Sequence, residues 1–493
     1  MTKVAAVLIA PDAGAMERQA RAALSRGADL VELRLDHVRG LTPGAVKRLA
    51  HAVGRRAIAT LRSKTEGGGG AVPDERRAVL LSECARLPFA YLDLERRADG
   101  PRIDALRGKR GHGPTTVVSE HFPRPADPAD VADALEACAA LGDVAKVATP
   151  VEDLEDAVAL VDLARSRASK GGRCVVIGMG AAGMLTRALA DDAGQEIQYA
   201  AFVNASASGQ LALGTAVRLR GRPPLVVGIV GHPLGHSISP QIHEAAFAAA
   251  NLPAVYLPFD VEADDLRLLL DAPDRLRLHG FNVTIPHKEA VAGLVDDLDG
   301  DAEALGAVNT VVVADGWTKG HNTDVYGFRL ALRSLGLRVG GRSALVVGAG
   351  GAARAVVHVL LREGAKVAVV SRTPARAERL AESFDDPVDV LELEDVGSRG
   401  PWDLLVNATP VGTKGGEPGL PVPDAVLRRA KFVFDLVYNP PETPLLAAAK
   451  RAGIPCTSGL TMLLHQAAKA YELWLGSPPD MRAMETAAKE ALR

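Results

Sequence analysis

Residues 144–148 read Val144-Ala145-Lys146-Val147-Ala148, a short apolar segment with one lysine inside it. This segment is the sixth of eight predicted strands in the first half of the chain, which cover residues 4–10, 29–34, 56–62, 89–94, 115–119, 144–148, 174–178 and 199–203. Amphipathic stretches between the strands predict helices at 15–26, 74–86, 128–141 and 151–166. Eight strand–helix units in about 220 residues predict a closed parallel (β/α)8 barrel, although an open doubly wound sheet would alternate in the same way.

Polar side chains gather within or just after the carboxyl ends of these predicted strands. They are Glu32, Arg34, Arg62, Glu66, His121, Lys146, Arg187, Ser206 and Gln210. In a barrel the carboxyl ends form one rim, where loops build the active site, whereas an open sheet would spread them along an edge. Their joint placement therefore favours a barrel with a site at that rim.

Lys146 has the most specific chemistry of this set. A charged amine is expensive to bury in an apolar strand, which favours the neutral, nucleophilic form. His121 follows the preceding strand and could move a proton, with Glu66 orienting it. The substrate's hydroxyl and carboxylate groups could be held by three arginines, Arg34, Arg62 and Arg187. Taken singly, each of these residues would more often be a solvated or structural side chain.

These residues resemble the type I 3-dehydroquinate dehydratase family over nearly all of residues 1–220. The matching motifs are Glu32-Leu33-Arg34-Leu35-Asp36, Leu61-Arg62-Ser63 with Glu66-Gly67-Gly68, Ser119-Glu120-His121, Lys146, Arg187, and Ser206 with Gly209-Gln210. The resemblance implies that Lys146 forms a Schiff base, that His121 shuttles protons and that Glu66 is the partner of His121. It also implies that Arg187 anchors the carboxylate of the substrate. Ser206 and Gln210 would lie on a loop that closes over the substrate.

Three features depart from that family pattern. Phe122 follows His121 directly, where the family usually has an acidic or amide residue first, and Ser208 stands where proline is usual. These two changes are expected to alter loop geometry and rate. The chain also begins at the first strand, without the hairpin that often covers the barrel floor, which is expected to cost stability rather than chemistry.

The second half follows a short linker, Arg222-Pro223-Pro224, and contains a dinucleotide-binding pattern. Residues 343–347 predict a strand, and Gly348-Ala349-Gly350-Gly351-Ala352-Ala353-Arg354 opens a helix, as in the phosphate-binding turn of a Rossmann unit. The next predicted strand ends in Ser371-Arg372-Thr373 rather than in an acidic residue. Arg372 and Arg376 therefore suit the 2′-phosphate of NADP, although two solvated arginines at a helix start would look the same.

Two further segments point to a small acid substrate that carries a hydroxyl group. Ser237 and Ser239 precede a predicted helix, where they could hold a carboxylate or simply cap the helix. Lys288 and Asp324 each follow a strand end. If they converge on one hydroxyl they form an acid/base pair for alcohol–ketone chemistry, whereas the simpler alternative is a surface ion pair.

Together these segments resemble shikimate dehydrogenase over residues 225–493. Further matching motifs are Asn282-Val283-Thr284-Ile285-Pro286-His287-Lys288, Ala307-Val308-Asn309-Thr310, Asn407-Ala408-Thr409-Pro410-Val411-Gly412, Asp435-Leu436-Val437-Tyr438-Asn439-Pro440 and Gly459-Leu460-Thr461-Met462-Leu463-Leu464-His465-Gln466. The resemblance implies that Lys288 and Asp324 are catalytic. It implies a substrate site of Ser237, Ser239, Thr284, Asn309, Tyr438 and Gln466. It implies a cofactor site of Gly348, Ala349, Gly350, Gly351, Ala352, Ser371, Arg372, Thr373, Arg376, Thr409, Gly459 and Met462. One departure is Glu244, where asparagine is usual.

The composition excludes several other classes of protein. A net charge of −3 gives no electrostatic reason to expect nucleic acid or an anionic membrane as a partner. The four cysteines, Cys84, Cys138, Cys174 and Cys456, are never in a Cys-x-x-Cys pair, which argues against a zinc cluster and predicts no metal. Reduced thiols and the lack of a visible targeting segment predict a cytoplasmic location.

We therefore predict an α/β chain in which a (β/α)8 barrel at 1–221 precedes a two-lobe α/β unit. That unit comprises a substrate-binding lobe at 225–325, completed by 458–493, and an NADP-binding Rossmann lobe at 326–457. The barrel is expected to dehydrate 3-dehydroquinate to 3-dehydroshikimate, and the second unit to reduce this product with NADPH to shikimate, as in the biosynthesis of chorismate and aromatic amino acids. The oligomeric state is open.

Two alternatives remain at this point. One is a non-catalytic regulator that senses quinate or shikimate and derives from the same domains. Such a protein would tend to lose its catalytic groups, but Lys146, His121, Lys288 and Asp324 are all present. The other is a catabolic dehydrogenase that oxidises quinate, against which Arg372 and the barrel domain weigh.

Overall fold

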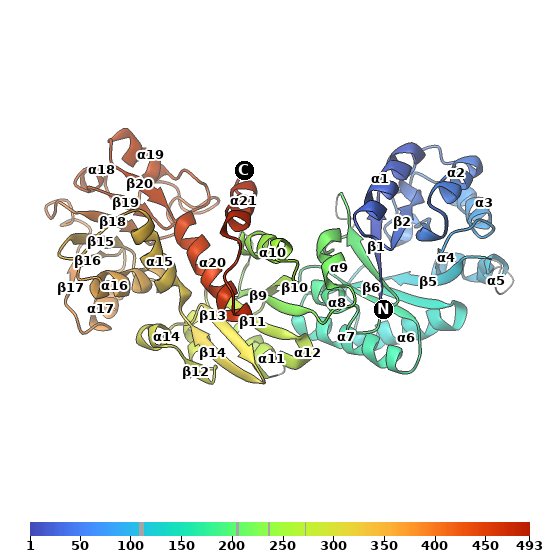
Figure 1. Cartoon of the computed structure of the whole chain (residues 1–493), viewed down its shortest axis with the longest axis horizontal. Coiled ribbons are helices and arrows are strands. Elements are labelled where there is room, and N and C mark those ends of the chain that lie inside the picture. The colour runs from blue at the N-terminus through green and yellow to red at the C-terminus, as the bar shows by residue number, and fades with distance from the viewer. Residues whose placement is uncertain (108–112, 204–206, 235–236, 272) are drawn as a thin grey trace. The chain divides into compact units, whose positions relative to one another are not determined.

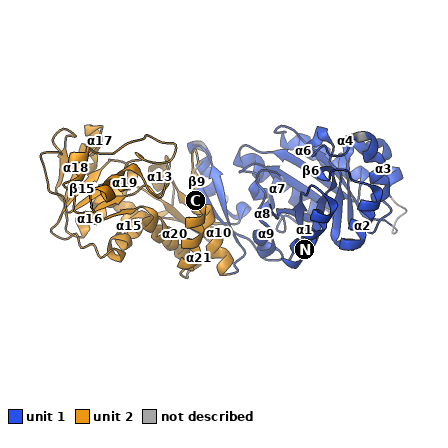
Figure 2. Ribbon diagram, turned by 90° about the horizontal axis from the view of Figure 1, so that it is seen from above, with its two compact units in different colours: residues 1–229, 251–278 blue, residues 230–250, 279–493 orange. Residues whose placement is uncertain are grey.

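The computed structural model describes residues 1–107, 113–203, 207–234, 237–271 and 273–493 (Figure 1). The chain divides into two compact units, shown in different colours in Figure 2. Unit 1 contains Met1–Ile229 and Asn251–Leu278, and unit 2 contains Val230–Ala250 and His279–Arg493. Residues 251–278 are thus counted with the barrel, although the sequence suggested that they belong to the second half.

Unit 1 contains a nearly closed parallel barrel of eight strands in the order β7-β6-β5-β4-β3-β2-β1-β8. The strands are β1 (Lys3–Leu8), β2 (Leu30–Arg34), β3 (Ala57–Thr60), β4 (Tyr91–Glu95), β5 (Thr115–His121), β6 (Val144–Pro150), β7 (Cys174–Met179) and β8 (Ile197–Ala201). Where β7 and β8 meet, the backbone N–H of Glu196 donates to the carbonyl of Cys174 at 2.9 Å. The predicted barrel is confirmed, and the open doubly wound sheet is wrong for this half.

Helices follow the barrel strands in alternation. They are α1 (Ala13–Ser25), α2 (Pro43–Val53), α3 (Asp74–Cys84), α4 (Arg96–Asp99), α5 (Ile103–Leu106), α6 (Pro128–Leu141), α7 (Leu154–Ser169), α8 (Met184–Ala188) and α9 (Leu213–Leu219). Side-chain caps fix several starts: Asp12 accepts the N–H of Ala15, and Thr42 accepts the N–H of Ala45. Strand β5 is longer than predicted, so that His121 is its last residue rather than part of the following loop.

A polar cluster lies at the amino-terminal end of the barrel. Tyr91 Oη donates to Glu196 Oε1 at 2.6 Å, and Lys3 Nζ donates to Tyr91 Oη at 2.6 Å and to Glu196 Oε1 at 3.0 Å. Arg173 adds two hydrogen bonds to Glu196 at 3.1 and 2.9 Å. These donors, Arg173 first, lower the pKa of Glu196 to about 2 although burial opposes the shift. We call these four residues the floor cluster.

The other strands form two six-stranded sheets. The first has the order β10-β9-β11-β13-β14-β12, with β9 (Leu225–Gly231), β10 (Ala254–Asp260), β11 (Leu278–Val283), β12 (Asp297–Leu298), β13 (Thr310–Ala314) and β14 (Trp317–His321). The second is parallel, in the order β17-β16-β15-β18-β19-β20, with β15 (Ser343–Val347), β16 (Lys366–Val370), β17 (Val388–Leu391), β18 (Leu404–Asn407), β19 (Val433–Asp435) and β20 (Cys456–Ser458). The parallel sheet, flanked by helices, is the predicted Rossmann sheet.

The helices of this half pack along the two sheets. They are α10 (Ser239–Ala249), α11 (Leu266–Asp271), α12 (Pro273–Leu276), α13 (Lys288–Ala292), α14 (Gly300–Leu305), α15 (Thr323–Ser334), α16 (Gly351–Arg362), α17 (Pro374–Glu382), α18 (Asp424–Leu427), α19 (Pro444–Arg451), α20 (Leu460–Leu475) and α21 (Met481–Ala491). Within unit 2, α20 packs closely on α15. A Cβ atom at Gly327 would lie only 2.7 Å from the carbonyl of Met462, so the glycine permits this close approach. Trp474 Nε1 donates to the carbonyl of Val311 at 2.9 Å, which ties α20 to β13.

Removing the charge of Glu196 should destabilise the barrel most at neutral pH. A carboxyl whose folded-state pKa is lowered contributes stability that is present above its unfolded value, here 4.5, and is lost as the pH falls toward about 2. Glu196→Gln should lower the free energy of unfolding by about 1 kcal/mol at pH 7, because two of its partners are half-exposed. Urea unfolding, followed by circular dichroism between pH 7 and pH 3, checks this. A cost that does not shrink on acidification contradicts the assignment.

Candidate active sites

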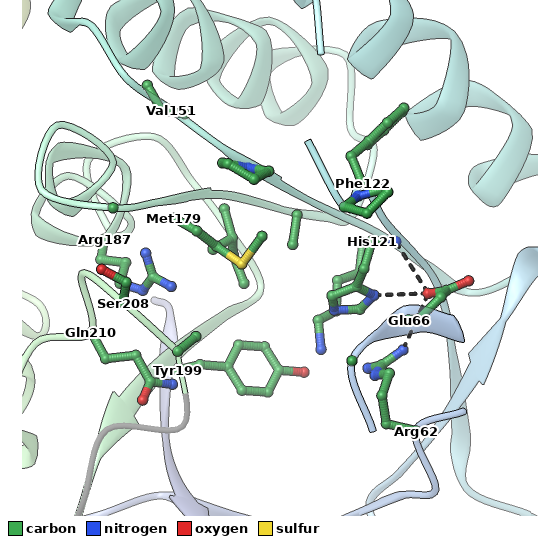
Figure 3. A pocket seen from close by; sticks show the side chains of 18 of the residues that line it. Arg62, Glu66, His121, Phe122, Val151, Met179, Arg187, Tyr199, Ser208 and Gln210 are labelled. Carbon is green, nitrogen blue, oxygen red and sulfur yellow. Dashed lines mark hydrogen bonds and ion pairs between the residues drawn. The ribbon is translucent and has the colours of Figure 1, made fainter. Parts of the chain in front are cut away.

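The carboxyl end of the barrel opens into a pocket of about 560 Å³ (Figure 3). Its lining includes eight of the nine residues predicted for this site, Glu32, Arg34, Arg62, Glu66, His121, Lys146, Arg187 and Gln210. The ninth, Ser206, lies outside the described residues. Separate strand ends and loops therefore contribute to one cavity, as the barrel topology requires.

Lys146 is buried inside the barrel, with 3% of its surface exposed. Its Nζ donates to Asp93 Oδ2 at 2.9 Å and lies 3.8 Å from Glu32 Oε1. It also lies over the ring of Tyr199, 4.2 Å from the centroid. The lysine therefore does not reach into solvent, and two carboxylates neutralise its ammonium before substrate binds.

Asp93 holds the cations of this site together, and the sequence reasoning did not find it. Its Oδ2 also accepts from Arg62 Nη2 at 3.1 Å, and its Oδ1 accepts from Ser119 Oγ at 2.6 Å. Burial alone would raise the pKa of Asp93, but Arg62 and Lys146 overcome burial and hold it well below its usual range. The signal in the sequence was the strand Tyr91-Leu92-Asp93-Leu94-Glu95, in which carboxylates alternate with leucines.

His121 and Glu66 form a pair on one wall of the pocket (Figure 3). His121 Nδ1 lies 3.0 Å from Glu66 Oε2, which also accepts the backbone N–H of His121 at 3.1 Å. Burial, and then Arg62 and Lys146, lower the pKa of His121 well below its usual value, so the imidazole is neutral at pH 7. Burial, and then Glu95, raise the pKa of Glu66 to about 7. The wall thus presents a neutral imidazole beside a carboxyl group whose pKa is raised.

Arg187 is the one predicted clamp without a carboxylate partner among the described residues. It lies on α8, is 4% exposed, and donates through Nη1 to the carbonyl of Gly178, while its Nε has no acceptor in the described part of the chain. Burial lowers the pKa of its guanidinium to about 10. A buried cation with an unused donor, which lines a pocket, is suited to bind a carboxylate.

The other two predicted clamps are already paired within the protein. Arg34 donates to both carboxylate oxygens of Asp36, at 3.0 and 2.8 Å. Asp36 in turn accepts the N–H of Gly69 at 2.8 Å, which anchors the loop that carries Glu66. Arg62 pairs with Asp93, as described above. Both arginines line the pocket, but the structure also uses them to position neighbouring groups.

Unit 2 brings Lys288 and Asp324 together. Lys288 begins α13 and Asp324 lies in the first turn of α15, and Lys288 Nζ donates to Asp324 Oδ2 at 2.6 Å. Their side chains are 21% and 14% exposed. A Cβ atom at Gly351 would lie 4.0 Å from Lys288 Cδ, so the glycine-rich turn is adjacent to this pair. The pair is therefore partly buried beside the predicted cofactor site, not an ordinary surface ion pair.

Two predicted substrate residues, Asn309 and Gln466, contact the residue before Asp324. Asn309 Oδ1 accepts the backbone N–H of Thr323 at 2.6 Å, and Gln466 Oε1 accepts from Thr323 Oγ1 at 3.3 Å. Both amides are thus fixed by the residue before Asp324, with their nitrogens left to donate. Ser237 Oγ accepts the N–H of Ser239 at 3.2 Å, so this serine shapes the start of α10.

Two more predicted substrate residues belong to strand ends. The N–H of Thr284, just after β11, donates to the carbonyl of Val230 at 2.8 Å. Tyr438 follows β19, and burial raises the pKa of its hydroxyl. A phenol that stays protonated can serve as a hydrogen-bond donor.

The turn before α16 fits a pyrophosphate group. Gly348 has a φ of 114°, and a Cβ there would lie 3.0 Å from the carbonyl of Ala408, so only glycine is suitable. Gly350 caps α16 without a side-chain hydrogen bond, and a Cβ there would meet no atom within 4 Å. The N–H groups of the first turn, including Gly351 and Ala352, have no partner within the helix. This open helix start suits a bound phosphate, while Ala349 packs against the core.

Arg372 lies at the end of β16, where the adenosine 2′-phosphate was expected. Its Nη1 lies 2.9 and 2.6 Å from the two carboxylate oxygens of Glu417, and both side chains are more than half exposed. Ser371 Oγ accepts the N–H of Thr373 at 3.3 Å, and Arg376 is exposed on α17. Glu417 was not among the residues predicted from the sequence, and it is the ion-pair partner of Arg372.

The remaining predicted cofactor residues are Thr409, Gly459 and Met462. Thr409 Oγ1 donates to Asn407 Oδ1 at 2.6 Å at the end of β18. A Cβ at Gly459 would lie 2.0 Å from the carbonyl of Leu436, so this position excludes any side chain. Met462 is buried in the core of the Rossmann lobe.

The described residues contain neither a candidate membrane-spanning helix nor a candidate metal cluster. None of their helices is long and apolar enough to cross a membrane. No cluster of three or more histidine, cysteine or acidic side chains among them could hold a metal ion.

Four family models match the chain in order. They are Type I 3-dehydroquinase at residues 4–220, Shikimate dehydrogenase substrate binding domain at 229–311, Shikimate / quinate 5-dehydrogenase at 329–410 and Shikimate 5′-dehydrogenase C-terminal domain at 459–489.

Individual relatives agree with these matches in the second half. The shikimate dehydrogenase (NADP(+)) of Rubrobacter xylanophilus is 46% identical over 269 residues, covering 53% of this chain and 94% of the relative. That of Methanopyrus kandleri is 45% identical over 279 residues, covering 54% and 96%. The crystal structure of shikimate 5-dehydrogenase from Thermus thermophilus in complex with NADP(H) and shikimate is 39% identical, with a TM-score of 0.50, and covers 54% of this chain and 100% of that chain. The chain therefore belongs to the shikimate dehydrogenase family in its second half and carries a type I 3-dehydroquinase domain in its first.

Proposed function

We propose that this chain is a bifunctional enzyme of the shikimate pathway. The barrel dehydrates 3-dehydroquinate to 3-dehydroshikimate, and unit 2 reduces that product to shikimate with NADPH. The observation that carries the proposal is the barrel pocket, in which a buried lysine, a neutral histidine and an arginine with an unused donor line one cavity. The NADP-dependent relatives support the second activity.

In the barrel, Lys146 Nζ would add to the ketone carbon of the substrate after a neighbouring carboxylate, Asp93 or Glu32, accepts a proton from the ammonium. Loss of the ketone oxygen as water gives a protonated imine, which makes the adjacent C–H acidic. Neutral His121 would remove that proton and return it to the leaving hydroxyl. Water would then hydrolyse the imine of the product, which breaks the C–N bond and releases 3-dehydroshikimate from Lys146. Arg187 would hold the substrate carboxylate throughout.

In unit 2, Lys288 and Asp324 would act on the hydroxyl end of the substrate. Lys288 Nζ would give its proton to the oxygen of the ketone during reduction, and Asp324 would hold the amine in place at 2.6 Å. The turn from Gly348 to Ala352 would bind the pyrophosphate of the cofactor, and Arg372 its 2′-phosphate. NADPH, when bound there, supplies the hydride.

We propose domain boundaries at residues 221, 325 and 457. We also propose a cytoplasmic location. All four cysteines are free, and three of them are buried. Burial raises the pKa of the thiols of Cys84 and Cys138 to about 12, so these cysteines are not reactive. Unpaired cysteines are typical of a reducing compartment, which supports this location.

Borohydride should trap the barrel imine on Lys146. With 3-dehydroquinate present, reduction should add the mass of the ligand to the peptide that contains Lys146, because a secondary amine formed from the imine is stable. Lys146→Ala should lose both the adduct and dehydration, while Lys64→Ala is the matched control at the rim and should keep both. Mass spectrometry that finds the adduct on another lysine would rule out Lys146.

The rate of dehydration should rise with pH through about 7, because the pKa of Glu66 is raised to about that value. Above it, the ionised carboxylate stabilises the imidazolium that His121 becomes during proton transfer. Glu66→Gln should remove this inflection and lower kcat by about 10-fold or more, the scale expected for weakening a general base. The measurement is a pH profile of kcat for both proteins. An unchanged inflection in the variant would assign it to another group.

Arg372→Ala should raise the KM for NADPH by about 30-fold, equivalent to about 2 kcal/mol for one charge-assisted contact, and change the KM for NADH little. Glu417→Gln is the informative companion. It frees Arg372 from its present partner and should lower the KM for NADPH. Initial rates of 3-dehydroshikimate reduction with NADPH and NADH test both variants. If the unmodified enzyme used the two cofactors equally, the role of Arg372 would have to be abandoned.

A further inference from the structure

Tyr199 lines the barrel pocket, and the proposed mechanism leaves its buried hydroxyl unused. Tyr199 lies on β8 and is 4% exposed. Its Oη has no hydrogen-bond partner among the residues that the structure describes. A buried hydroxyl without a partner reduces the stability of a protein, so a phenylalanine would suit the fold better.

The position of this hydroxyl explains why a tyrosine stands there. Tyr199 lines the same pocket as Lys146, and Lys146 Nζ lies 4.2 Å from the centre of its ring. Figure 3 shows the ring between Arg187 and Gln210 on one side and Arg62 and Glu66 on the other, with the hydroxyl pointing toward the latter pair. The ring that carries the hydroxyl is therefore close to the atom that would attack the substrate.

The surroundings also keep the phenol protonated. Burial, and then the carboxylates of Glu32 and Asp93, raise its pKa well above the usual value. A phenol in that state cannot replace His121 as a base, but it can donate a hydrogen bond to an oxygen atom of a ligand. Within the described part of the pocket it has no acceptor that would compete with such a ligand.

We propose that Tyr199 is a further substrate-contacting residue of the barrel, whose hydroxyl donates a hydrogen bond to the ketone oxygen of the substrate carbon that Lys146 attacks. When the C–N bond forms, the same donor holds the hydroxyl of the carbinolamine. That hydroxyl then leaves as water as the C–O bond breaks, taking the proton first released from the lysine ammonium. Tyr199 itself exchanges no proton overall. This inference rests on the proposed dehydratase function.

The first test compares Tyr199→Phe with the unmodified chain. Because only a donor to the substrate is lost, kcat/KM for dehydration should fall by about 10- to 100-fold, and the rate of borohydride trapping should fall by a similar factor. Thermal stability should stay equal or rise, because an unpaired buried hydroxyl has been removed. Shikimate oxidation with NADP should not change, which reports that unit 2 is intact.

Tyr91→Phe is the matched control in the same barrel. The Tyr91 hydroxyl belongs to the floor cluster, where it is bonded to Lys3 and Glu196, and it lies at the other end of the strands. This variant should lose stability and keep its dehydration rate, which is the reverse of the result expected for Tyr199→Phe. If both variants lose stability and neither loses rate, both hydroxyls are structural and the proposal is wrong.

The outcomes separate this proposal from the function on which it rests. If the unmodified chain traps no imine and dehydrates no 3-dehydroquinate, the proposed function fails and the role of Tyr199 fails with it. If the unmodified chain is active and Tyr199→Phe keeps the same kcat/KM and trapping rate, only the role of Tyr199 is overturned.

Discussion

The barrel site depends on one buried contact, the ion pair between Lys146 and Asp93 at 2.9 Å. A lysine ammonium cannot be buried at the centre of an apolar barrel without a compensating charge. Asp93 supplies that charge. It also pairs with Arg62, which follows the carboxyl end of β3. The same pair must open before the lysine can act as a nucleophile. The ion pair therefore stabilises the resting site. The lysine becomes a nucleophile only after its ammonium has lost a proton.

The charges of the pocket are divided between holding the site and binding a substrate. Arg34 and Arg62 are neutralised by protein carboxylates, whereas Arg187 is buried with no such partner among the described residues. The proposed function therefore places the acid end of the substrate at Arg187 and its ketone end at Lys146. Unit 2 also has a lysine–carboxylate ion pair, Lys288 with Asp324. This pair lies near the start of α16, which has no side-chain cap.

The sequence predicted the order of elements better than the contacts between them. The strand at residues 343–347 has the predicted bounds, because an apolar run between turn residues determines where a strand lies. The partners of Lys146 and Arg372 could not be predicted from the sequence. Asp93 and Glu417 reach them because of the register of the strands and the path of a loop. Nor could the unpaired hydroxyl of Tyr199 be predicted, because a missing partner is visible only once every neighbour is placed.

The most direct measurement is the consumption of NADPH by the full chain with 3-dehydroquinate as the only substrate. The account predicts that the unmodified protein consumes NADPH in proportion to 3-dehydroquinate. It predicts that Lys146→Ala does not, yet recovers consumption when 3-dehydroshikimate is added, and that Lys288→Ala consumes none with either substrate while still forming 3-dehydroshikimate. No NADPH consumption by the unmodified chain from 3-dehydroquinate, in protein that is folded and reduces 3-dehydroshikimate, would contradict it.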